Sequence, residues 1–328
     1  MATGIAIRPD PAAANAVDDA VAQASDAFDR GVRQVWFGQR FDIDALTLAA
    51  VIAHAVPGLG VGTAIVPINP RHPLLVASSA QTAQAAAHGN FSLGIGLGGN
   101  ELEQQAFGLP AGREIARLRE YLTVLRAIVD DGVVDFQGHE LTARPPLSPV
   151  VGGGLPLPIY VAAMGPRALR VAGELADGTL PYLAGPRTIE EFIAPIIAQA
   201  ASEAGRPSPR IVASVPVAVS NAPATARAEA AKSLHFYDQF PSYQKIMARE
   251  GVTHAADLAV IGDPDAVIRQ LLRYRAAGAT DLVLNPFQTK PSALHGLWAV
   301  AAELDATTPS TPSTPHQPDI DTNSEGTS

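Results

Sequence analysis

The sequence of 328 residues predicts one large α/β domain with the (β/α)8 architecture, the TIM barrel. Three observations favour this fold class. About eight apolar stretches typical of strands alternate with stretches typical of helices. The strand candidates are rich in β-branched and aliphatic residues, as parallel strands covered on both faces are. The number of repeated βα units favours a closed barrel over an open doubly wound sheet.

The predicted strands are short apolar runs bounded by polar or glycine-containing segments. The first, GIAI, lies near the N-terminus, and the last, TDLVLNPF, follows the final predicted helix. The eight strands are expected at residues 4–7, 32–38, 59–68, 91–98, 157–163, 177–183, 210–220 and 280–287.

The predicted helices follow these strands and carry recognisable start and stop signals. Asp42 or Asp44 caps the second helix, Pro73 begins the third and Gly89 ends it. Apolar residues from Ile115 to Val129 recur at spacings of three and four, which indicates an amphipathic helix. The other helices are expected at residues 11–30, 44–55, 72–89, 167–176, 187–204, 223–250 and 264–277.

Three segments do not fit the simple βα repeat. Residues 99–112 are predicted to form a polar loop, and residues 133–143 a hairpin that turns at Gly138. The long helical stretch 223–250 is predicted to be an inserted lid. The barrel domain is expected to span residues 1–304, and the Thr/Ser/Pro-rich residues 305–328 a disordered tail, because they cannot bury enough surface to offset the entropy of ordering.

Composition excludes several function classes. The formal net charge of −9 argues against a nucleic-acid partner, since such binding depends on basic patches. The chain contains no Cys, and its eight His residues show no metal-ligand spacing, so we expect no metal site. No signal peptide or membrane span is recognisable, and we expect a cytoplasmic protein without a membrane partner.

The stretch FSLGIGLGGN contains Gly94, Gly96 and Gly99 at the G-x-G-x-x-G spacing of a dinucleotide-binding turn. That motif opens directly onto a helix and is followed about 20 residues later by an acidic residue at a strand end. Here three predicted strands precede the glycines, and Glu120 falls inside a helix, so the context argues against this turn. Gly94, Gly96 and Gly98 alternate along a strand instead. They clear space either for a neighbouring backbone or for a flat ligand.

The loops after the strands are where a barrel carries its active site. His72 follows the third strand and is a candidate for chemistry, although a helix N-terminal role explains it as well. Met164, Gly165 and Pro166 lead from the fifth strand into a helix. Free N–H groups at such a helix start bind phosphate, and Arg167 adds positive charge, although an ordinary turn is an equal alternative.

Taken together, several stretches resemble the bacterial luciferase-like monooxygenase superfamily, and within it the coenzyme F420-dependent oxidoreductases of actinobacteria. The resemblance spans about residues 4–286, and it rests on the order and spacing of the stretches. The matching stretches are VWFGQRFDIDALTLAA, GTAIVPINPRHPLLVASSAQTAQAA, FSLGIGLG, REIARLREYLTVLRAI, PIYVAAMGPRALRVAGELADGTLPYLAGPRTI and ADLAVIGDPDAVIRQLLRYRAAGATDLV.

The resemblance implies a barrel that holds a deazaflavin or flavin at its C-terminal mouth. It implies a non-proline cis peptide at Ala64-Ile65 behind the cofactor ring, and glycines beside the ring. It also implies phosphate contacts from the loop after the fifth strand. The cofactor-binding residues implied or inferred are Gln39, Ala64, Ile65, Gly96, Gly98, Ala163, Met164, Gly165 and Arg167.

One departure affects the chemistry that the resemblance implies. F420-dependent sugar-phosphate dehydrogenases of the superfamily carry an Asp-His pair after the second strand, where this chain has Gln39-Arg40. Neither side chain serves as a general base near neutral pH. Reduction of an activated alkene or imine by hydride transfer needs only one proton afterwards. The candidate donors of this proton are His72, Tyr182 and water. Gly99-Asn100 stands about where a catalytic acid would come, with Glu101 nearby.

The first functional hypothesis is therefore an F420-dependent oxidoreductase acting on a small organic substrate as a reductase. Its polyanionic cofactor tail would meet basic side chains, of which Arg71, Arg113, Arg167 and Arg187 are available. The alternative is an FMN-dependent monooxygenase that uses reduced flavin and oxygen. A barrel that binds a ligand without catalysis and a barrel aldolase or isomerase rank lower. Dimerisation is common in the superfamily, so a homodimer is compatible with the resemblance.

The predicted lid contains a cluster of four aromatic residues. These are Phe236, Tyr237, Phe240 and Tyr243. They either face a substrate or pack the lid onto the barrel, and the sequence leaves both possibilities open.

Overall fold

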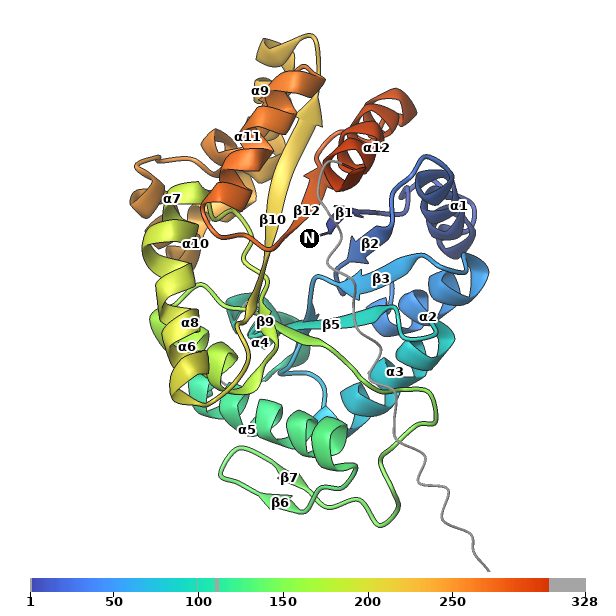
Figure 1. Cartoon of the computed structure of the whole chain (residues 1–328), viewed down its shortest axis with the longest axis vertical. Helices are drawn as coiled ribbons and strands as arrows, with labels where there is room; N and C mark the ends of the chain where they lie inside the picture. Colours follow the sequence, from blue (N-terminus) through green and yellow to red (C-terminus); the bar gives the residue numbers. More distant parts are fainter. Residues whose placement is uncertain (1, 99, 110–111, 307–328) are drawn as a thin grey trace, which may run out of the picture.

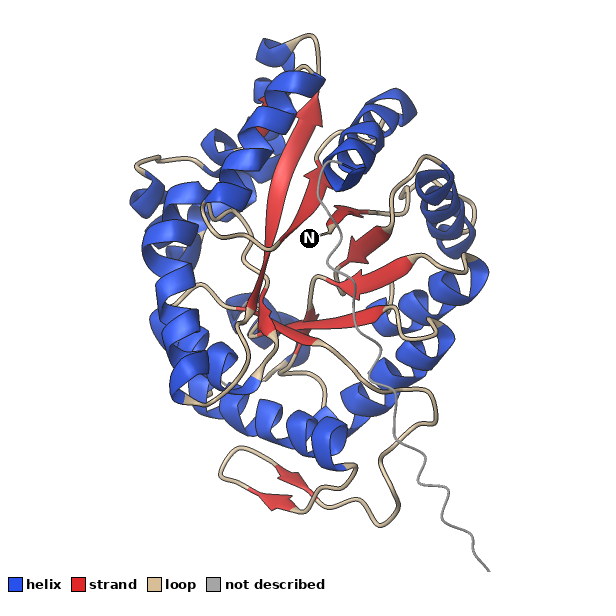
Figure 2. Ribbon diagram, in the orientation of Figure 1, coloured by secondary structure: helices blue, strands red, loops and turns tan. Residues whose placement is uncertain are grey.

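The computed structural model describes residues 2–98, 100–109 and 112–306. Residues 307–328 of the predicted tail lie outside what it describes, as do Gly99 and the side chains of residues 100–102, which include Glu101. The predicted barrel is confirmed: eight parallel strands close on themselves, and helices surround them (Figure 1, Figure 2). Each of the eight strands pairs with the next one in chain order, and the eighth pairs with the first, which closes the ring.

The eight barrel strands lie where they were predicted; the first begins one residue earlier, and the other seven are shorter. They are β1 (Thr3–Ala6), β2 (Gln34–Phe37), β3 (Gly60–Thr63), β5 (Phe91–Gly96), β8 (Ile159–Ala162), β9 (Gly178–Thr179), β10 (Arg210–Val219) and β12 (Asp281–Pro286). The predicted strand 59–68 is interrupted, and its continuation is β4 (Val66–Pro67), which pairs with β5. β11 (Val260–Gly262) extends the sheet beside β10.

The helices that cover the barrel begin and end mostly at the expected signals. Asn15 caps the first helix by accepting from the N–H groups of Val17 and Asp18, so the helix starts at Ala16 rather than at residue 11. The covering helices are α1 (Ala16–Asp29), α2 (Ala45–Ala55), α3 (Pro73–Ala86), α5 (Glu114–Arg126) with the π-helical turn η1 (Ala127–Asp131), α6 (Pro166–Leu175), α7 (Pro186–Thr188), η2 (Ile189–Ile193), α8 (Ala194–Glu203), α11 (Pro264–Ala276) and α12 (Pro291–Ala306).

Two helices were not predicted. The segment 99–112 was expected to be a loop, but it contains α4 (Asn100–Phe107), whose polar sequence gives little helical periodicity. α12 follows the last strand and buries Leu297, Trp298 and Leu304 against the barrel. It runs two residues past the predicted domain boundary.

The hairpin and the lid form at the predicted positions, but the lid is divided into several helices. The hairpin consists of β6 (Phe136–Gln137) and β7 (Thr142–Ala143), which pair antiparallel outside the ring of helices (Figure 1). The lid is not one helix, because Pro241 disfavours helical geometry at Phe240, which is extended at φ −94° and ψ 125°. It contains α9 (Pro223–Leu234), the 3-10 helix η3 (His235–Gln239), α10 (Pro241–Glu250) and η4 (Ala255–Leu258).

The interior of the barrel is a packed core. The Trp36 indole lies inside it with Tyr160, Leu180 and other buried residues. Gly4 makes room for this ring, because a Cβ there would come within 2.7 Å of the indole. The strands are thus held by a filled interior, and the open space of the molecule lies at one end of the barrel.

Candidate active site

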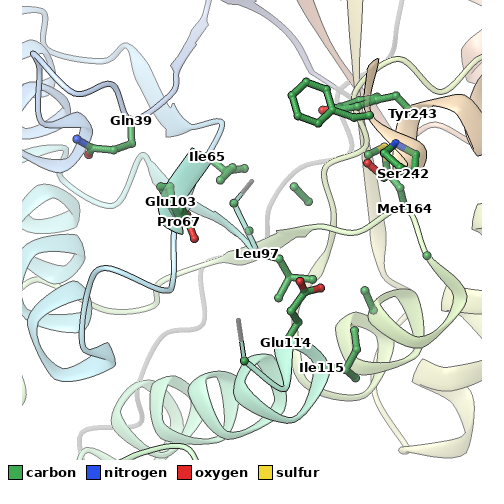
Figure 3. Close-up of a pocket in the computed structure, with 18 of the residues that line it drawn as sticks. Gln39, Ile65, Pro67, Leu97, Glu103, Glu114, Ile115, Met164, Ser242 and Tyr243 are labelled. Atoms are coloured by element: carbon green, nitrogen blue, oxygen red, sulfur yellow. The ribbon is translucent and has the colours of Figure 1, made fainter. Parts of the chain in front are cut away.

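A large cavity lies at the carboxyl ends of the barrel strands. Its volume is about 1940 Å³. Its wall contains residues that directly follow β2, β3, β5 and β8, together with residues of α4, α5 and the lid (Figure 3). This is the end of a barrel at which enzymes of this architecture carry their active sites.

Gln39 lines the cavity, but its amide is used within the protein. Nε2 donates to the carbonyl oxygens of Arg40 and Ile43 at 2.7 and 3.1 Å. Oε1 accepts from the Ala45 N–H at 3.1 Å and also from Arg71. Gln39 therefore fixes the loop between β2 and α2. Arg40 forms a bidentate ion pair with the exposed carboxylate of Asp42.

The peptide bond between Ala64 and Ile65 is cis, as the resemblance implied. It separates β3 from β4 at the edge of the cavity. The Ile65 side chain lines the cavity, whereas Ala64 does not. The Ile65 carbonyl accepts from the Gln39 N–H at 3.0 Å, which ties this segment to the β2–α2 loop.

The glycines of β5 serve different purposes. A methyl group at Gly94 would overlap the carbonyl oxygen of Thr63, and the Thr63 hydroxyl bonds to the Gly94 backbone at 2.9 Å in both directions. Gly94 therefore provides clearance for backbone. Gly96 lines the cavity, and a Cβ there would come within 2.9 Å of the Ile65 side chain. Of the two roles that the sequence left open for these glycines, clearance for a neighbouring backbone is the one that Gly94 has.

Gly98 makes room for a carboxyl that sequence reasoning missed. Its φ is +73°, and a Cβ there would overlap the Glu103 carboxyl. Glu103, on α4, is only 5% exposed and lines the cavity. Its Oε2 accepts from Asn69 Nδ2 at 2.7 Å, and Oε1 is buried without a partner in the described structure. The only signal in the sequence was the acidic run directly after the glycines.

Burial is the main cause that raises the pKa of the Glu103 carboxyl above its ordinary value of 4.5. The hydrogen bond from Asn69 and the charge of Arg117 act in the opposite direction, and the nearby Glu114 carboxylate adds to the rise. Glu114 is itself in the cavity wall (Figure 3). The α4–α5 side of the cavity thus carries two carboxyls, one of which has a raised pKa.

The loop after β8 leads into the N-terminus of α6. Met164, Gly165 and Arg167 line the cavity, whereas Ala163 is buried behind them. Gly165 is the N-cap, and no side chain caps the helix. The N–H groups of the first turn are therefore available to an anion in the cavity, as the sequence suggested.

Of the four arginines expected near a cofactor tail, two remain available. Arg71 pairs with Asp44, and Arg187 pairs with Glu191 and does not line the cavity. Arg113 and Arg167 line it and form no side-chain ion pair or hydrogen bond within the described part of the chain. Lys245 of α10 is a third such cation.

His72 is not part of the cavity wall, so the structure gives no support to its expected role as proton donor. It caps α3: Nδ1 accepts from the Leu74 N–H at 3.2 Å, so Nε2 carries the proton and donates to the Thr142 carbonyl at 2.9 Å. Both ring nitrogens are engaged in local structure, which was the competing interpretation.

Tyr182 is also absent from the cavity wall, and its expected catalytic role is likewise unsupported. Its ring packs 5.2 Å from that of Tyr237 and 6.4 Å from that of Tyr243, measured between centroids. Burial raises the pKa of its phenol well above the ordinary value, which makes it a poorer acid. Tyr237 and Tyr243 do line the cavity, so the lid aromatics both pack the lid and face the open space.

Two features are absent from the residues that the structure describes. No group of three or more His, Cys, Asp or Glu side chains could hold a metal ion there. None of the helices in that part of the chain is long and apolar enough to cross a membrane.

Comparison with known proteins agrees with this architecture. The chain is 28% identical over 251 residues to an uncharacterized protein of Mycobacterium bovis, covering 73% of this chain and 72% of that protein. It is 26% identical over 307 residues to a 5,10-methylenetetrahydromethanopterin reductase of Methanopyrus kandleri, covering 79% and 86%.

Solved structures share the fold. The coenzyme F420-dependent tetrahydromethanopterin reductase of Methanopyrus kandleri matches with a TM-score of 0.75 at 21% identity, covering 93% of this chain and 98% of the other. An FMN complex of the oxygenating constituent of 3,6-diketocamphane monooxygenase from Pseudomonas putida matches with a TM-score of 0.74 at 17% identity, covering 93% and 97%. The model of the luciferase-like monooxygenase family matches residues 1–281, and the chain therefore belongs to that family.

Proposed function

We propose that the protein is a coenzyme F420-dependent oxidoreductase that transfers a hydride to a small organic substrate. The observation that carries the choice of F420 over FMN is the set of unpaired cations at the cavity. The N-terminus of α6 with Arg167 suffices for a single phosphate. Arg113 and Lys245 offer further positive charge, which suits the long polyanionic tail of F420.

The cavity wall fits the ring and the phosphate of such a cofactor. Ile65 and Gly96 give a flat apolar wall, and Met164 and Gly165 lead from there to the free N–H groups of α6. When bound, reduced F420 supplies the hydride, and the protein supplies binding, orientation and exclusion of water.

Reduction of a double bond also requires one proton. With His72 and Tyr182 outside the cavity wall, the Glu103 carboxyl is the acid that we assign to this proton. Its burial favours the protonated form, and a raised pKa brings a carboxyl closer to the range useful for general acid catalysis near neutral pH.

An FMN-dependent monooxygenase is the second candidate. The observation that favours it is the similarity to the diketocamphane monooxygenase, whose TM-score differs little from that of the F420-dependent reductase. The M. kandleri reductase among the sequence relatives favours F420.

The test is to titrate the purified protein with F420 and with FMN, and to compare Arg167→Ala with Arg144→Ala. Arg144 is exposed, pairs with Asp135 and lies away from the cavity, so it is a matched control. We expect micromolar binding of F420 that Arg167→Ala weakens about tenfold or more, since a charge-assisted hydrogen bond contributes about 1.5–3 kcal/mol. Binding of FMN without binding of F420 would contradict the proposal.

A further inference from the structure

The cavity is larger than one cofactor requires. Small-molecule and cofactor sites typically occupy about 300–1,000 Å³, whereas this cavity measures about 1940 Å³. Space therefore remains beside the cofactor for a second molecule of considerable size.

The exposed phenylalanines of the described structure gather at this cavity. Phe41 is 70% exposed, Phe107 48% and Phe236 50%, and all three line it. Leaving such rings in water forgoes the free energy that their burial would provide, and exposed apolar groups that cluster around a cavity mark a binding site. A ligand that covers them would recover part of this free energy.

Together with the half-buried Phe240, these three rings form two pairs on different elements. Phe41 of the β2–α2 loop and Phe107 of α4 lie 5.7 Å apart between ring centroids. Phe236 and Phe240 of the lid lie 4.8 Å apart. Gln39 is close to Phe41 in the sequence, and Tyr243 is close to Phe240. Figure 3 shows Gln39 and Tyr243 on different sides of the cavity. The pairs thus come from separate parts of the wall.

The lid pair continues inward as an unbroken series of ring contacts. Phe236 contacts Tyr237 at 5.6 Å, and Tyr237 contacts Tyr243 at 4.9 Å, again between centroids. The neutral side chains of Gln239 and Ser242 stand beside these rings in the same wall. Here the lid offers aromatic surface and neutral hydrogen-bonding groups.

We propose that the substrate of this cavity is a bulky, flat, largely uncharged polycyclic aromatic molecule, held by the Phe41–Phe107 pair and the Phe236–Phe240 pair. The inference rests on the proposed function in that it takes the cavity to hold the cofactor as well. Aromatic rings bind such a molecule by offset or edge-to-face contacts. The neutral groups of the lid would bond to oxygen substituents at its edge.

The experiment uses the neutral fluorescent probe N-phenyl-1-naphthylamine, titrated into the full-length protein with and without saturating F420. Anthraquinone and glucose 6-phosphate serve as flat aromatic and polar charged competitors. The variants are Phe41→Ala/Phe107→Ala and Phe236→Ala. Leu75→Ala is the matched control, because Leu75 is 67% exposed and does not line the cavity.

The proposal predicts one probe site per chain, which persists with F420 bound and from which anthraquinone displaces the probe. The double variant weakens probe binding at least about fivefold, as the loss of two aromatic contacts requires, and Phe236→Ala weakens it several-fold. Leu75→Ala leaves it unchanged, and circular dichroism and F420 affinity confirm that the variants fold.

Wild-type affinity in the double variant, absence of probe binding to the wild-type protein, or displacement by glucose 6-phosphate but not by anthraquinone would overturn the proposal. Failure of F420 to bind, with the probe results as expected, would instead overturn the proposed function alone. The two claims are therefore tested separately.

Discussion

Replacement of Gly98 by Ala tests the contact between β5 and the Glu103 carboxyl. The new methyl group would overlap that carboxyl, so Glu103 must move and its 2.7 Å hydrogen bond with Asn69 must break or lengthen. The left-handed backbone at φ +73° adds a second penalty for any side chain.

The magnitudes of the two penalties can be separated. The left-handed conformation costs about 1–2 kcal/mol for a non-glycine residue. Loss of the hydrogen bond to a buried carboxyl costs about 1–3 kcal/mol more. Gly108 is the matched control, because its φ of +66° is similar and a Cβ there would meet no atom of the described residues within 4 Å. We expect Gly98→Ala to destabilise by about 2–5 kcal/mol and Gly108→Ala by about 1–2 kcal/mol.

The assay is urea unfolding of the wild-type protein, of the single variants Gly98→Ala, Gly108→Ala and Glu103→Ala, and of the double variant Gly98→Ala/Glu103→Ala. In the double variant the overlap is gone, so its destabilisation should fall short of the sum of the two single effects. Equal destabilisation by Gly98→Ala and Gly108→Ala, together with additive effects in the double variant, would refute the claim that Gly98 accommodates Glu103.

Three further changes test the site. Glu103→Gln removes a carboxyl whose pKa is higher in the folded protein than in the unfolded chain. The stability that such a carboxyl contributes to the fold is lost as the pH rises from its unfolded pKa through its folded pKa. Unfolding measured from pH 4 upward should therefore show the Gln variant gaining stability relative to the wild-type protein above the ordinary value of 4.5; a constant difference would argue against the raised pKa. Gly94→Ala should fail to fold or lose more than about 3 kcal/mol, because the methyl group meets backbone that cannot move aside. Gly96→Ala meets only the end of the Ile65 side chain, so it should fold with a smaller loss and weaken cofactor binding by displacing Ile65 into the cavity; unchanged affinity would mean that Gly96 serves packing alone.

The barrel was predictable because each βα unit carries its own signal. Runs such as LGVGTAIVPI, caps such as Asp44 and the Pro at the start of α3 are local features, and the structure places strand and helix where they indicate. α4 escaped prediction because a short polar helix has no buried apolar stripe to reveal it.

The site was predictable only in part, because it depends on what each residue meets in space. The loops after β3, β5 and β8 do line the cavity, as a barrel requires. The sequence could not show that Gly94 faces the Thr63 backbone or that His72 bonds to Thr142, which is 70 residues away. Glu103 was overlooked for the same reason: its pKa depends on burial, which is a property of the folded chain.

We have proposed that the cavity at the carboxyl ends of the strands binds F420 in preference to FMN. Equilibrium titration of the wild-type protein with each cofactor at low and high salt tests it most directly. We expect micromolar affinity for F420 that weakens steeply with salt, because several cations take part, and much weaker affinity for FMN. Tighter binding of FMN, or F420 binding that is independent of salt, would contradict it.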